Sequence, residues 1–326
     1  MVTELRYWQA VNRALAEEME RDPRVVLVGE DVGTPGGAFG ATRGLRERFG
    51  PDRVRDTPIS ELGIVGLGVG AALAGLRPVV EVMFNDFLTL ALDQLANQAA
   101  KLRFMTGGRA RVPLVVRTLV GAGKGTGPQH GQSLEAWLGH VPGLLVAMPA
   151  TPADAYHLLR AAIRCDDPVV VLESLRQWNL RGQIADEEPL EVGRAAVRRP
   201  GADLTLVSVG GALPRAERAC ELAAGEGIDV ELIDLRWLWP LDWACVESSL
   251  RKTGRLVVVH DAVGFLGPGA ELAARAAERV ALAAPVVRVA PPRTPVPFAP
   301  SLEERYFPGA ERIVAACRKV MGRSDG

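Results

Sequence analysis

Short apolar runs that alternate with helical segments set the strongest limit on how this 326-residue chain can fold. The apolar runs have the length and valine content of buried strands. The segments between them repeat apolar residues at helical spacing and end near glycine or proline. Such alternation predicts a parallel sheet with helices on both faces, and hence an α/β fold. In the first half of the chain the strand-like runs are residues 25–28, 77–83, 112–117, 144–147 and 168–172, and the helical segments are residues 6–20, 42–49, 86–104 and 151–164.

The alternation lapses between about residues 173 and 199, where glycine, proline and acidic residues gather. We interpret this stretch as a linker with a small hairpin. The alternation resumes at Leu204 and continues to a closing helix at residues 310–321. The sequence therefore predicts two doubly wound α/β domains, at residues 1–180 and 201–326, with a linker at 181–200. The second domain is the smaller one.

Composition excludes several kinds of partner. The net charge of -1 argues against a nucleic-acid-binding surface and against electrostatic docking to a membrane. No apolar run reaches the ~18 residues that a membrane span needs, and the N-terminus leads into an amphipathic helix without an apolar signal core. The four cysteines lack metal-like spacing and are typical of reduced thiols, so we expect a cytoplasmic protein.

The segment Asp56–Gly63 stands at the start of an unusual predicted helix. Ser60 is a good N-cap residue, and Glu61 follows it just inside the helix. After Glu61 no charged side chain occurs until Arg77, and interior glycines in this stretch each cost roughly 1 kcal/mol of helix stability. A helix gains from such glycines where it lies against another backbone or a flat ligand. The alternative is that Glu61 only favours the positive end of the helix dipole. The glycines are Gly66, Gly68, Gly70 and Gly75.

Two short segments resemble nucleotide-binding motifs, but we assign a nucleotide-binding function to neither. The residues from Gly66 to Ala71 match the dinucleotide fingerprint, which must follow a strand directly. Here they follow the cap Ser60 and already lie inside a helix. The segment Gly121–Thr126 follows a predicted strand and resembles a phosphate-binding loop. That motif needs a helix opening at Lys124, which the glycines and Pro128 that follow oppose.

His130 is a candidate functional residue. It ends the glycine-rich loop after a predicted parallel strand, and open α/β sheets place ligands at such loops. The alternative is a surface or capping role, since a lone histidine is most often one of these. The other histidines, His140, His157 and His260, have no comparable setting. Phe87 lies where the strand at residues 77–83 turns into the long helix at residues 86–104, and an aromatic ring there is either core or one wall of a pocket for a flat ring.

Taken together and in order, these motifs resemble the beta subunit of the thiamine-diphosphate-dependent 2-oxo acid dehydrogenases, a transketolase-like family. The resemblance covers residues 6–320, and the order of its motifs is more specific than any one of them. The branched-chain, pyruvate and acetoin members look alike at this level. The motifs are Gly29–Gly33, Asp56–Glu61, Gly75–Pro78, Asp93-Gln94, Gly127–His130, His140–Leu144, Ile233–Arg236, Pro240–Asp242 and Thr294–Pro297.

The resemblance implies a pyrimidine-binding domain, a transketolase C-terminal domain and a partner. In this family an alpha subunit holds magnesium and the diphosphate through a Gly-Asp-Gly motif, and this sequence contains no Gly-Asp-Gly. The chain should therefore hold only the pyrimidine half of the cofactor site, within an α2β2 heterotetramer on a lipoyl acyltransferase core. The implied reaction is oxidative decarboxylation of a 2-oxo acid with acyl transfer to lipoyl. Acetoin cleavage is an alternative, and a non-catalytic scaffold for the alpha subunit is another.

The resemblance also implies roles for individual residues. Glu61 matches the glutamate that hydrogen-bonds a pyrimidine nitrogen and favours the tautomer whose nitrogen removes the thiazolium proton. Leu62 and Phe87 match positions that contact the pyrimidine. His130 matches a histidine near the reacting centre, although Gly131 stands where the family usually has serine.

Some members of the family bind potassium through main-chain carbonyls. Because carbonyl ligation depends little on side-chain identity, the sequence leaves such a site open here. The choice between pyruvate, a branched-chain acid and acetoin is also left open. The residues that match the potassium ligands are Leu114, Ala162, Ile163, Cys165 and Asp167.

Overall fold

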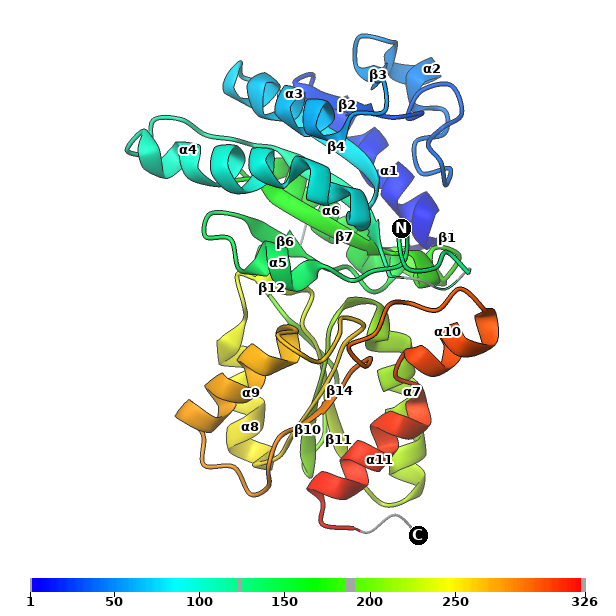
Figure 1. Cartoon of the computed structure of the whole chain (residues 1–326), viewed down its shortest axis with the longest axis vertical. Coiled ribbons are helices and arrows are strands. Elements are labelled where there is room, and N and C mark those ends of the chain that lie inside the picture. The colour runs from blue at the N-terminus through cyan, green and yellow to red at the C-terminus, as the bar shows by residue number, and fades with distance from the viewer. Residues whose placement is uncertain (1, 122, 124, 186–190, 324–326) are drawn as a thin grey trace. The chain divides into compact units, whose positions relative to one another are not determined.

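The computed structural model describes residues 2–121, 123, 125–185 and 191–323. The chain forms two compact units (Figure 1). The N-terminal unit comprises Met1–Val120 and Trp137–Val192, and the C-terminal unit comprises Gly121–Ala136 and Gly193–Gly326. The segment that carries His130 thus belongs to the C-terminal unit, although it directly follows a strand of the N-terminal unit. We describe each unit by itself.

The N-terminal unit is built on a parallel sheet with the order β6-β7-β5-β4-β2-β3. Side chains on both faces of its central strands are buried, as expected for a parallel sheet covered by helices. The α/β class is therefore confirmed. The strands are β2 (Val25–Gly29), β3 (Val54–Asp56), β4 (Arg77–Phe84), β5 (Val115–Val120), β6 (Leu145–Ala147) and β7 (Val169–Ser174).

Helices cover both faces of this sheet. In Figure 1, α3 (Glu61–Leu73) and α4 (Ala100–Met105) lie on the near side, and α1 (Tyr7–Arg21) and α6 (Pro152–Arg164) lie on the far side. Helix α1 is fixed to α6 by Glu18, which is 1% exposed and accepts a hydrogen bond from Arg164 at 2.8 Å. The remaining short helices are α2 (Leu45–Phe49), η3 (Leu175–Gln177) and α5 (Glu135–Gly139), where the chain passes from one unit to the other.

The long helix predicted at residues 86–104 is wrong in detail. The structure has a 3₁₀ segment η1 (Asn85–Ala91), a π-helical segment η2 (Gln94–Ala99) and then α4. Nothing in the local sequence, which lacks glycine and proline, signals this change. The widened turn coincides with close packing on α3, where a Cβ placed on Gly66 would lie 3.6 Å from the Gln94 side-chain oxygen. Tertiary packing therefore overrides local helix propensity here.

The small hairpin predicted in the linker is also wrong. Strand β8 (Arg181–Ala185) pairs antiparallel with β1 (Val2–Arg6) in the N-terminal unit. Strand β9 (Ala196–Arg199) pairs antiparallel with β11 in the C-terminal unit, where Arg198 reaches the buried Asp234 at 2.6 Å. Each strand thus completes the edge of its own unit. Residues 186–190 of the predicted linker lie outside the described residues.

The C-terminal unit contains a second sheet with the order β14-β13-β10-β11-β9, in which only β9 runs antiparallel. A short helix, α10, follows the proline-rich segment and was not predicted. No described helix in either unit has the length and apolar content needed to span a bilayer. The elements are β10 (Leu204–Ser208), η4 (Gly210–Ala212), α7 (Leu213–Gly225), β11 (Val230–Asp234), β12 (Trp237–Trp239), α8 (Trp243–Thr253), β13 (Leu256–Val259), α9 (Pro268–Arg279), β14 (Val287–Val289), α10 (Pro300–Tyr306) and α11 (Ala310–Val320).

Candidate active site

The carboxyl ends of β2 and β3 are joined by Asp56. Its carboxylate accepts the N–H of Gly33 at 2.6 Å and a hydrogen bond from Arg46 at 2.5 Å. A Cβ placed on Gly33 would lie 2.4 Å from the same carboxylate, so any other residue there would displace the Asp56 side chain. The two motifs Gly29–Gly33 and Asp56–Glu61 therefore form one fixed corner of the N-terminal unit.

Glu61 lies at this corner as the first residue of α3. Ser60 occupies the N-cap position as predicted, but its side chain makes no capping hydrogen bond. The Glu61 side chain is partly exposed. Its charge acts on Glu30, whose pKa is raised by burial and by the negative charges of Asp31 and Glu61. Two carboxyl groups thus share the end of β2 and the start of α3.

Sequence reasoning missed Glu30 as a site residue. The only signal was its place in the motif Gly29–Gly33, directly after a buried strand. A carboxyl group whose charged form is disfavoured beside a second carboxyl is a common mark of functional sites.

Helix α3 has one packed side and one open side. On the packed side Gly68 is necessary, because a Cβ there would lie 2.8 Å from both Leu114 and Val80. From the sequence, the glycines are expected where the helix lies against another backbone or a flat ligand. At Gly68 the close contact is instead with the side chains of Leu114 and Val80. On the open side Leu62 is 51% exposed and Leu67 is 52% exposed. An apolar surface therefore begins next to Glu61 and continues along the helix.

Phe87 lies in η1 and is partly exposed. Its ring packs edge-to-face on Phe84 at 6.0 Å, and Phe84 packs in the same way on Phe39 at 5.6 Å. Phe87 is thus supported by an aromatic cluster and is partly exposed. It meets the geometric requirement for a pocket wall, and its contact with a cofactor stays a prediction.

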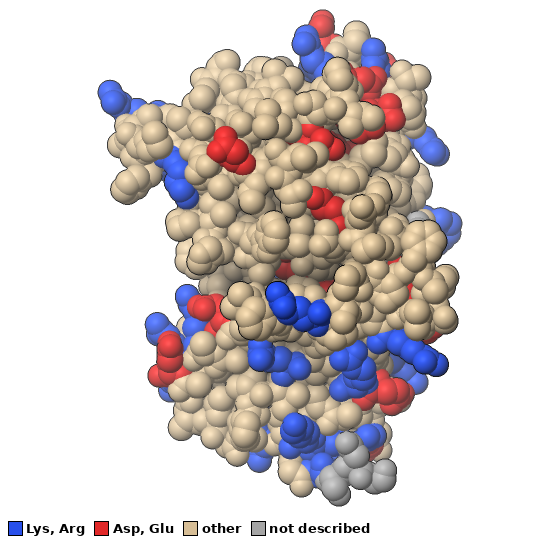
Figure 2. All heavy atoms as spheres, viewed as in Figure 1, with Lys and Arg blue, Asp and Glu red and all other residues tan. Residues whose placement is uncertain are grey.

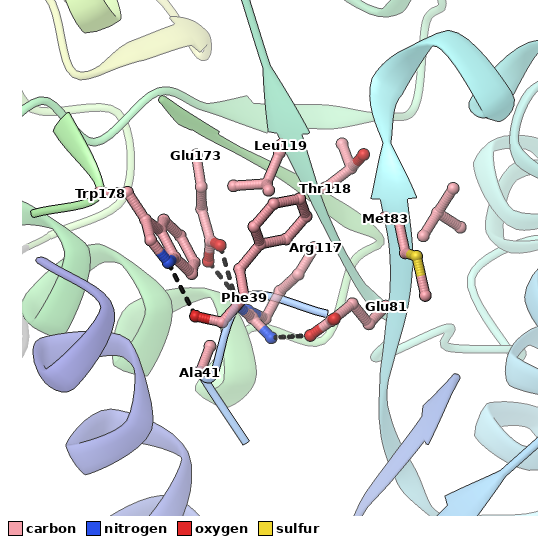
Figure 3. Close-up of a pocket in the computed structure, with 10 residues that line it drawn as sticks. Phe39, Ala41, Glu81, Met83, Arg117, Thr118, Leu119, Glu173 and Trp178 are labelled. Atoms are coloured by element: carbon pink, nitrogen blue, oxygen red, sulfur yellow. Dashed lines mark hydrogen bonds and ion pairs between the residues drawn. The ribbon is translucent and has the colours of Figure 1, made fainter. Parts of the chain in front are cut away.

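A buried ion-pair cluster, which we had not predicted, lies nearby in the same unit (Figure 3). Arg117 of β5 donates two hydrogen bonds of 2.8 Å to Glu173 of β7 and one of 2.7 Å to Glu81 of β4. Although burial opposes its charge, the two carboxylates raise the pKa of Arg117. The adjoining cavity of about 10 Å³ has room for no more than a water molecule. We therefore regard this cluster as structural.

His130 is partly exposed and belongs to the C-terminal unit. Its loop is closed at the base by a 3.0 Å hydrogen bond from the Gly121 N–H to the Gln132 carbonyl. The structure therefore brings Glu61 together with Glu30 and places His130 in the other unit. His260 is fully buried, its Nδ1 lies 2.9 Å from the Ala262 carbonyl, and burial lowers its pKa to about 4.

Four of the five carbonyls that match the potassium ligands, those of Leu114, Ala162, Ile163 and Cys165, already have protein partners. Arg77 donates to the Ile163 carbonyl at 2.8 Å and to the Cys165 carbonyl at 2.5 Å. The carbonyls of Leu114 and Ala162 accept main-chain N–H groups at 2.9 and 3.1 Å. A carbonyl oxygen has two lone pairs, so potassium binding stays a prediction. Among the described residues, no group of three or more His, Cys, Asp or Glu side chains could hold a metal ion.

The chain has two α/β units, with an acid at the head of α3 in the first, and its sequence matches the two domains of a transketolase-like protein. The N-terminal part, residues 3–179, matches the family model described as the transketolase pyrimidine binding domain, and residues 193–313 match the transketolase C-terminal domain. The solved structure of a split-gene transketolase, an inactive beta4 tetramer, superposes with a TM-score of 0.80 over 97% of this chain and 98% of that chain. At 22% identity this likeness shows the fold alone.

Curated relatives place the chain more narrowly. It is 42% identical to acetoin:2,6-dichlorophenolindophenol oxidoreductase subunit beta of Cupriavidus necator, with 98% of each chain covered. It is 43% identical to mitochondrial pyruvate dehydrogenase E1 component subunit beta-1 of Arabidopsis thaliana, over 98% of this chain and 90% of that one. It is 40% identical to 2-oxoisovalerate dehydrogenase subunit beta of Bacillus subtilis, over 97% of this chain and 98% of that one.

The chain therefore belongs to the beta subunits of the thiamine-diphosphate-dependent 2-oxo acid dehydrogenase family. The predicted resemblance and fold are confirmed. The relatives are oxidoreductase components, and their designation as beta subunits implies an alpha partner.

Proposed function

We propose that this chain supplies the pyrimidine half of a thiamine diphosphate site in a 2-oxo acid dehydrogenase that oxidatively decarboxylates pyruvate or a branched-chain 2-oxo acid. The acyl group then passes to a lipoyl group. The observation that carries the proposal is the position of Glu61 at the head of α3, beside the carboxyl group of Glu30 and an exposed apolar surface.

The residues around Glu61 fit a flat ring with one polar edge. A partly exposed carboxyl at a helix start can hold a ring nitrogen and a proton, and the half-exposed Leu62 and the Phe87 ring offer apolar faces. When bound, thiamine diphosphate supplies the electron sink for decarboxylation. Glu61 would orient the pyrimidine edge and share its proton, and Leu62 and Phe87 would exclude water from the ring faces. His130 would hold or move a proton near the reacting centre.

The surface around Glu61 is suited to the pyrimidine half of thiamine diphosphate and not to its diphosphate half. The charges around Glu61 are acidic, with Glu30 and Asp31 close by, so a diphosphate would be repelled there. We therefore assign the magnesium and diphosphate to the alpha subunit. The proposed assembly is an α2β2 heterotetramer that docks on a lipoyl acyltransferase core.

Glu61→Gln in the enzyme reconstituted with its alpha subunit tests the proposal. Pyruvate, 2-oxoisovalerate, 2-oxoglutarate and acetoin would be assayed with the wild-type pair and with the variant. We expect one of these substrates to be turned over, with a loss of about 100-fold or more in the variant, the scale of lost acid–base catalysis. Glu47→Gln is a matched control, because Glu47 is an exposed acid in the first turn of α2 in the same unit.

The outcomes separate the alternatives. Lack of turnover of all four substrates by the wild-type pair would reject the proposed function. Unchanged activity in Glu61→Gln would remove Glu61 from the chemistry and favour a scaffold role.

Acetoin cleavage is the second candidate. The observation in its favour is the 42% identity to the acetoin:2,6-dichlorophenolindophenol oxidoreductase subunit of Cupriavidus necator over 98% of both chains. It would use the same site to break a carbon–carbon bond in a ketol. A preference for acetoin over the three 2-oxo acids in the same assay would select it.

A further inference from the structure

The loop that carries His130 is fastened to the C-terminal unit by a buried acid. We call residues 121, 123 and 125–136, the described part of this stretch, the His130 loop. Glu303 of α10 is 5% exposed and accepts the Gly123 N–H at 2.9 Å with one oxygen. Its other oxygen lies 3.4 Å from the Gly125 nitrogen and accepts that N–H. One carboxylate therefore bridges two main-chain amides of the loop, a type of hydrogen bond that a charged acceptor strengthens.

The loop lies closely on the chain just before α10. Gly125 has a φ of +66°, and a Cβ there would lie 3.3 Å from the Phe298 carbonyl oxygen. Gly127 has a φ of +71°, and a Cβ there would lie 2.7 Å from the Phe298 ring. Both positions need glycine for conformation and for space. The glycines let the loop lie flat on this segment, and Glu303 then holds it there.

The other end of the loop is also held by an acid. Glu135 is 1% exposed, and the main-chain N–H groups of Glu135 itself and of Ala262, which follows β13, favour its charged form. One of its carboxyl oxygens has no hydrogen-bond partner among the described residues. His130 lies between the two anchors, at Glu303 and Glu135. The glycines between them would otherwise give this stretch large conformational freedom in the native state.

These contacts also explain why the segment resembles a phosphate-binding loop without being one. Two of the amides that such a loop would offer to a phosphate instead donate to the Glu303 carboxylate. The Glu303 carboxylate already accepts from these amides, so a phosphate would be repelled from them.

We propose that Glu303 is a positioning residue for His130: by bridging the amides of Gly123 and Gly125 it keeps the His130 loop in one conformation. The inference rests on the proposed function, because the role of His130 is part of that function. Glu303 does not touch the reacting atoms and acts only through the loop.

The test compares Glu303→Ala and Glu303→Gln in the enzyme reconstituted with its alpha subunit. Glu304→Ala is the matched control, since Glu304 is the neighbouring residue of α10 and is exposed. We expect Glu303→Ala to raise hydrogen exchange of peptides from the His130 loop by about 10-fold, as expected for loss of hydrogen bonds to a charged group. Exchange in β10 and β13 should stay unchanged. Glu303→Gln keeps one acceptor oxygen and should fall between wild type and Glu303→Ala.

Kinetic measurements on the Glu303 variants distinguish a positioning role of Glu303 from a general loss of stability. A misplaced loop should lower kcat by about 10- to 100-fold with little change in KM. The double variant Glu303→Ala/His130→Ala should be no slower than His130→Ala alone, because both changes remove the same contribution. Losses that multiply in the double variant would overturn the proposal, and so would unchanged exchange in the His130 loop of both Glu303 variants.

Failure of the proposed function and failure of the positioning role would give different results. If the wild-type pair turned over none of the substrates, the proposed function would fall, and the exchange data alone would decide whether Glu303 orders the loop. If turnover were normal and exchange were unchanged in both Glu303 variants, the positioning role would fall and the function would stand.

Discussion

Two buried titratable residues of the C-terminal unit have pKa values that move in opposite directions for the same reason. Burial disfavours the charged form of each group. For Glu135, burial and the nearby negative charge of Asp261 outweigh the main-chain hydrogen bonds and raise the pKa to about 7. For His260, burial lowers the pKa to about 4, so the ring is neutral at physiological pH. Glu135 therefore changes charge near neutral pH while it anchors the His130 loop.

This shift predicts how stability depends on pH. The folded-state pKa of Glu135 lies above the unfolded value of 4.5, so the folded protein binds this proton more tightly. The stabilising contribution of protonated Glu135 is complete below pH 4.5 and is lost as pH rises to about 7, by roughly 3 kcal/mol in total. Urea unfolding of wild type and Glu135→Gln at pH 5, 6, 7 and 8 would measure it. We expect the wild type to lose stability relative to the variant as pH rises, whereas a constant difference would refute the assignment.

At the scale of elements, Arg117 links three neighbouring strands of the N-terminal sheet. Glu81 on β4 and Glu173 on β7 flank β5, and both carboxylates are almost fully buried (Figure 3). Burial raises the pKa of Glu173, and the guanidinium of Arg117 opposes that rise. A buried charge without its partner is costly, so the guanidinium is needed as long as both acids remain.

Replacement of Arg117 by Met should therefore destabilise the protein by about 3–5 kcal/mol, the usual cost of leaving a buried charge unpaired. The triple variant Glu81→Gln/Arg117→Met/Glu173→Gln should recover a large part of this loss, because no charge then remains unpaired. Arg55→Met is the control: its ion pair with Asp52 is exposed, and such pairs contribute less than about 1 kcal/mol. Chemical unfolding of the four proteins measures these differences. Equal stability of Arg117→Met and wild type would contradict the argument.

These elements also show what the sequence could and could not predict. The start of helix α3 at Glu61 was predictable, because a cap residue, an acid and a charge-free run are all local signals. The Arg117 cluster was not predictable, since its members lie on three separate strands and meet only through strand register. The assignment of the His130 loop to the C-terminal unit depends on Glu303, far along the chain. The interruption of the helix at residues 86–104 arises from packing on α3, which no local pattern records.

At the scale of the whole molecule, the exposed side of α3 indicates a missing neighbour. Leu62, Leu67 and Leu73 are each about half exposed, at 51%, 52% and 48%. Figure 2 shows few charged side chains over this helix. Contiguous apolar surface of this kind on a folded protein commonly marks an interface. This agrees with a family whose members are named as beta subunits, and we propose that the partner contacts the chain next to Glu61.

The half-site proposal makes its clearest prediction for cofactor binding. The chain alone offers a pyrimidine edge at Glu61, but the acids Glu30 and Asp31 lie beside it and would repel a diphosphate. Calorimetric titration with thiamine diphosphate and magnesium should therefore show binding to the chain alone that is at least about 100-fold weaker than to the pair with its alpha subunit, a difference of roughly 3 kcal/mol.

Leu67→Glu sharpens this comparison, because it places a charge on the exposed side of α3 without touching Glu61. In this variant we expect weaker assembly with the alpha subunit and a matching loss of cofactor affinity, with the unfolding free energy of the isolated chain unchanged. Glu4→Lys, on the exposed strand β1, should leave both properties as in wild type. Tight magnesium-dependent binding of thiamine diphosphate by the isolated chain would mean that the diphosphate site lies on this polypeptide, and the division of the cofactor between two subunits would have to be abandoned.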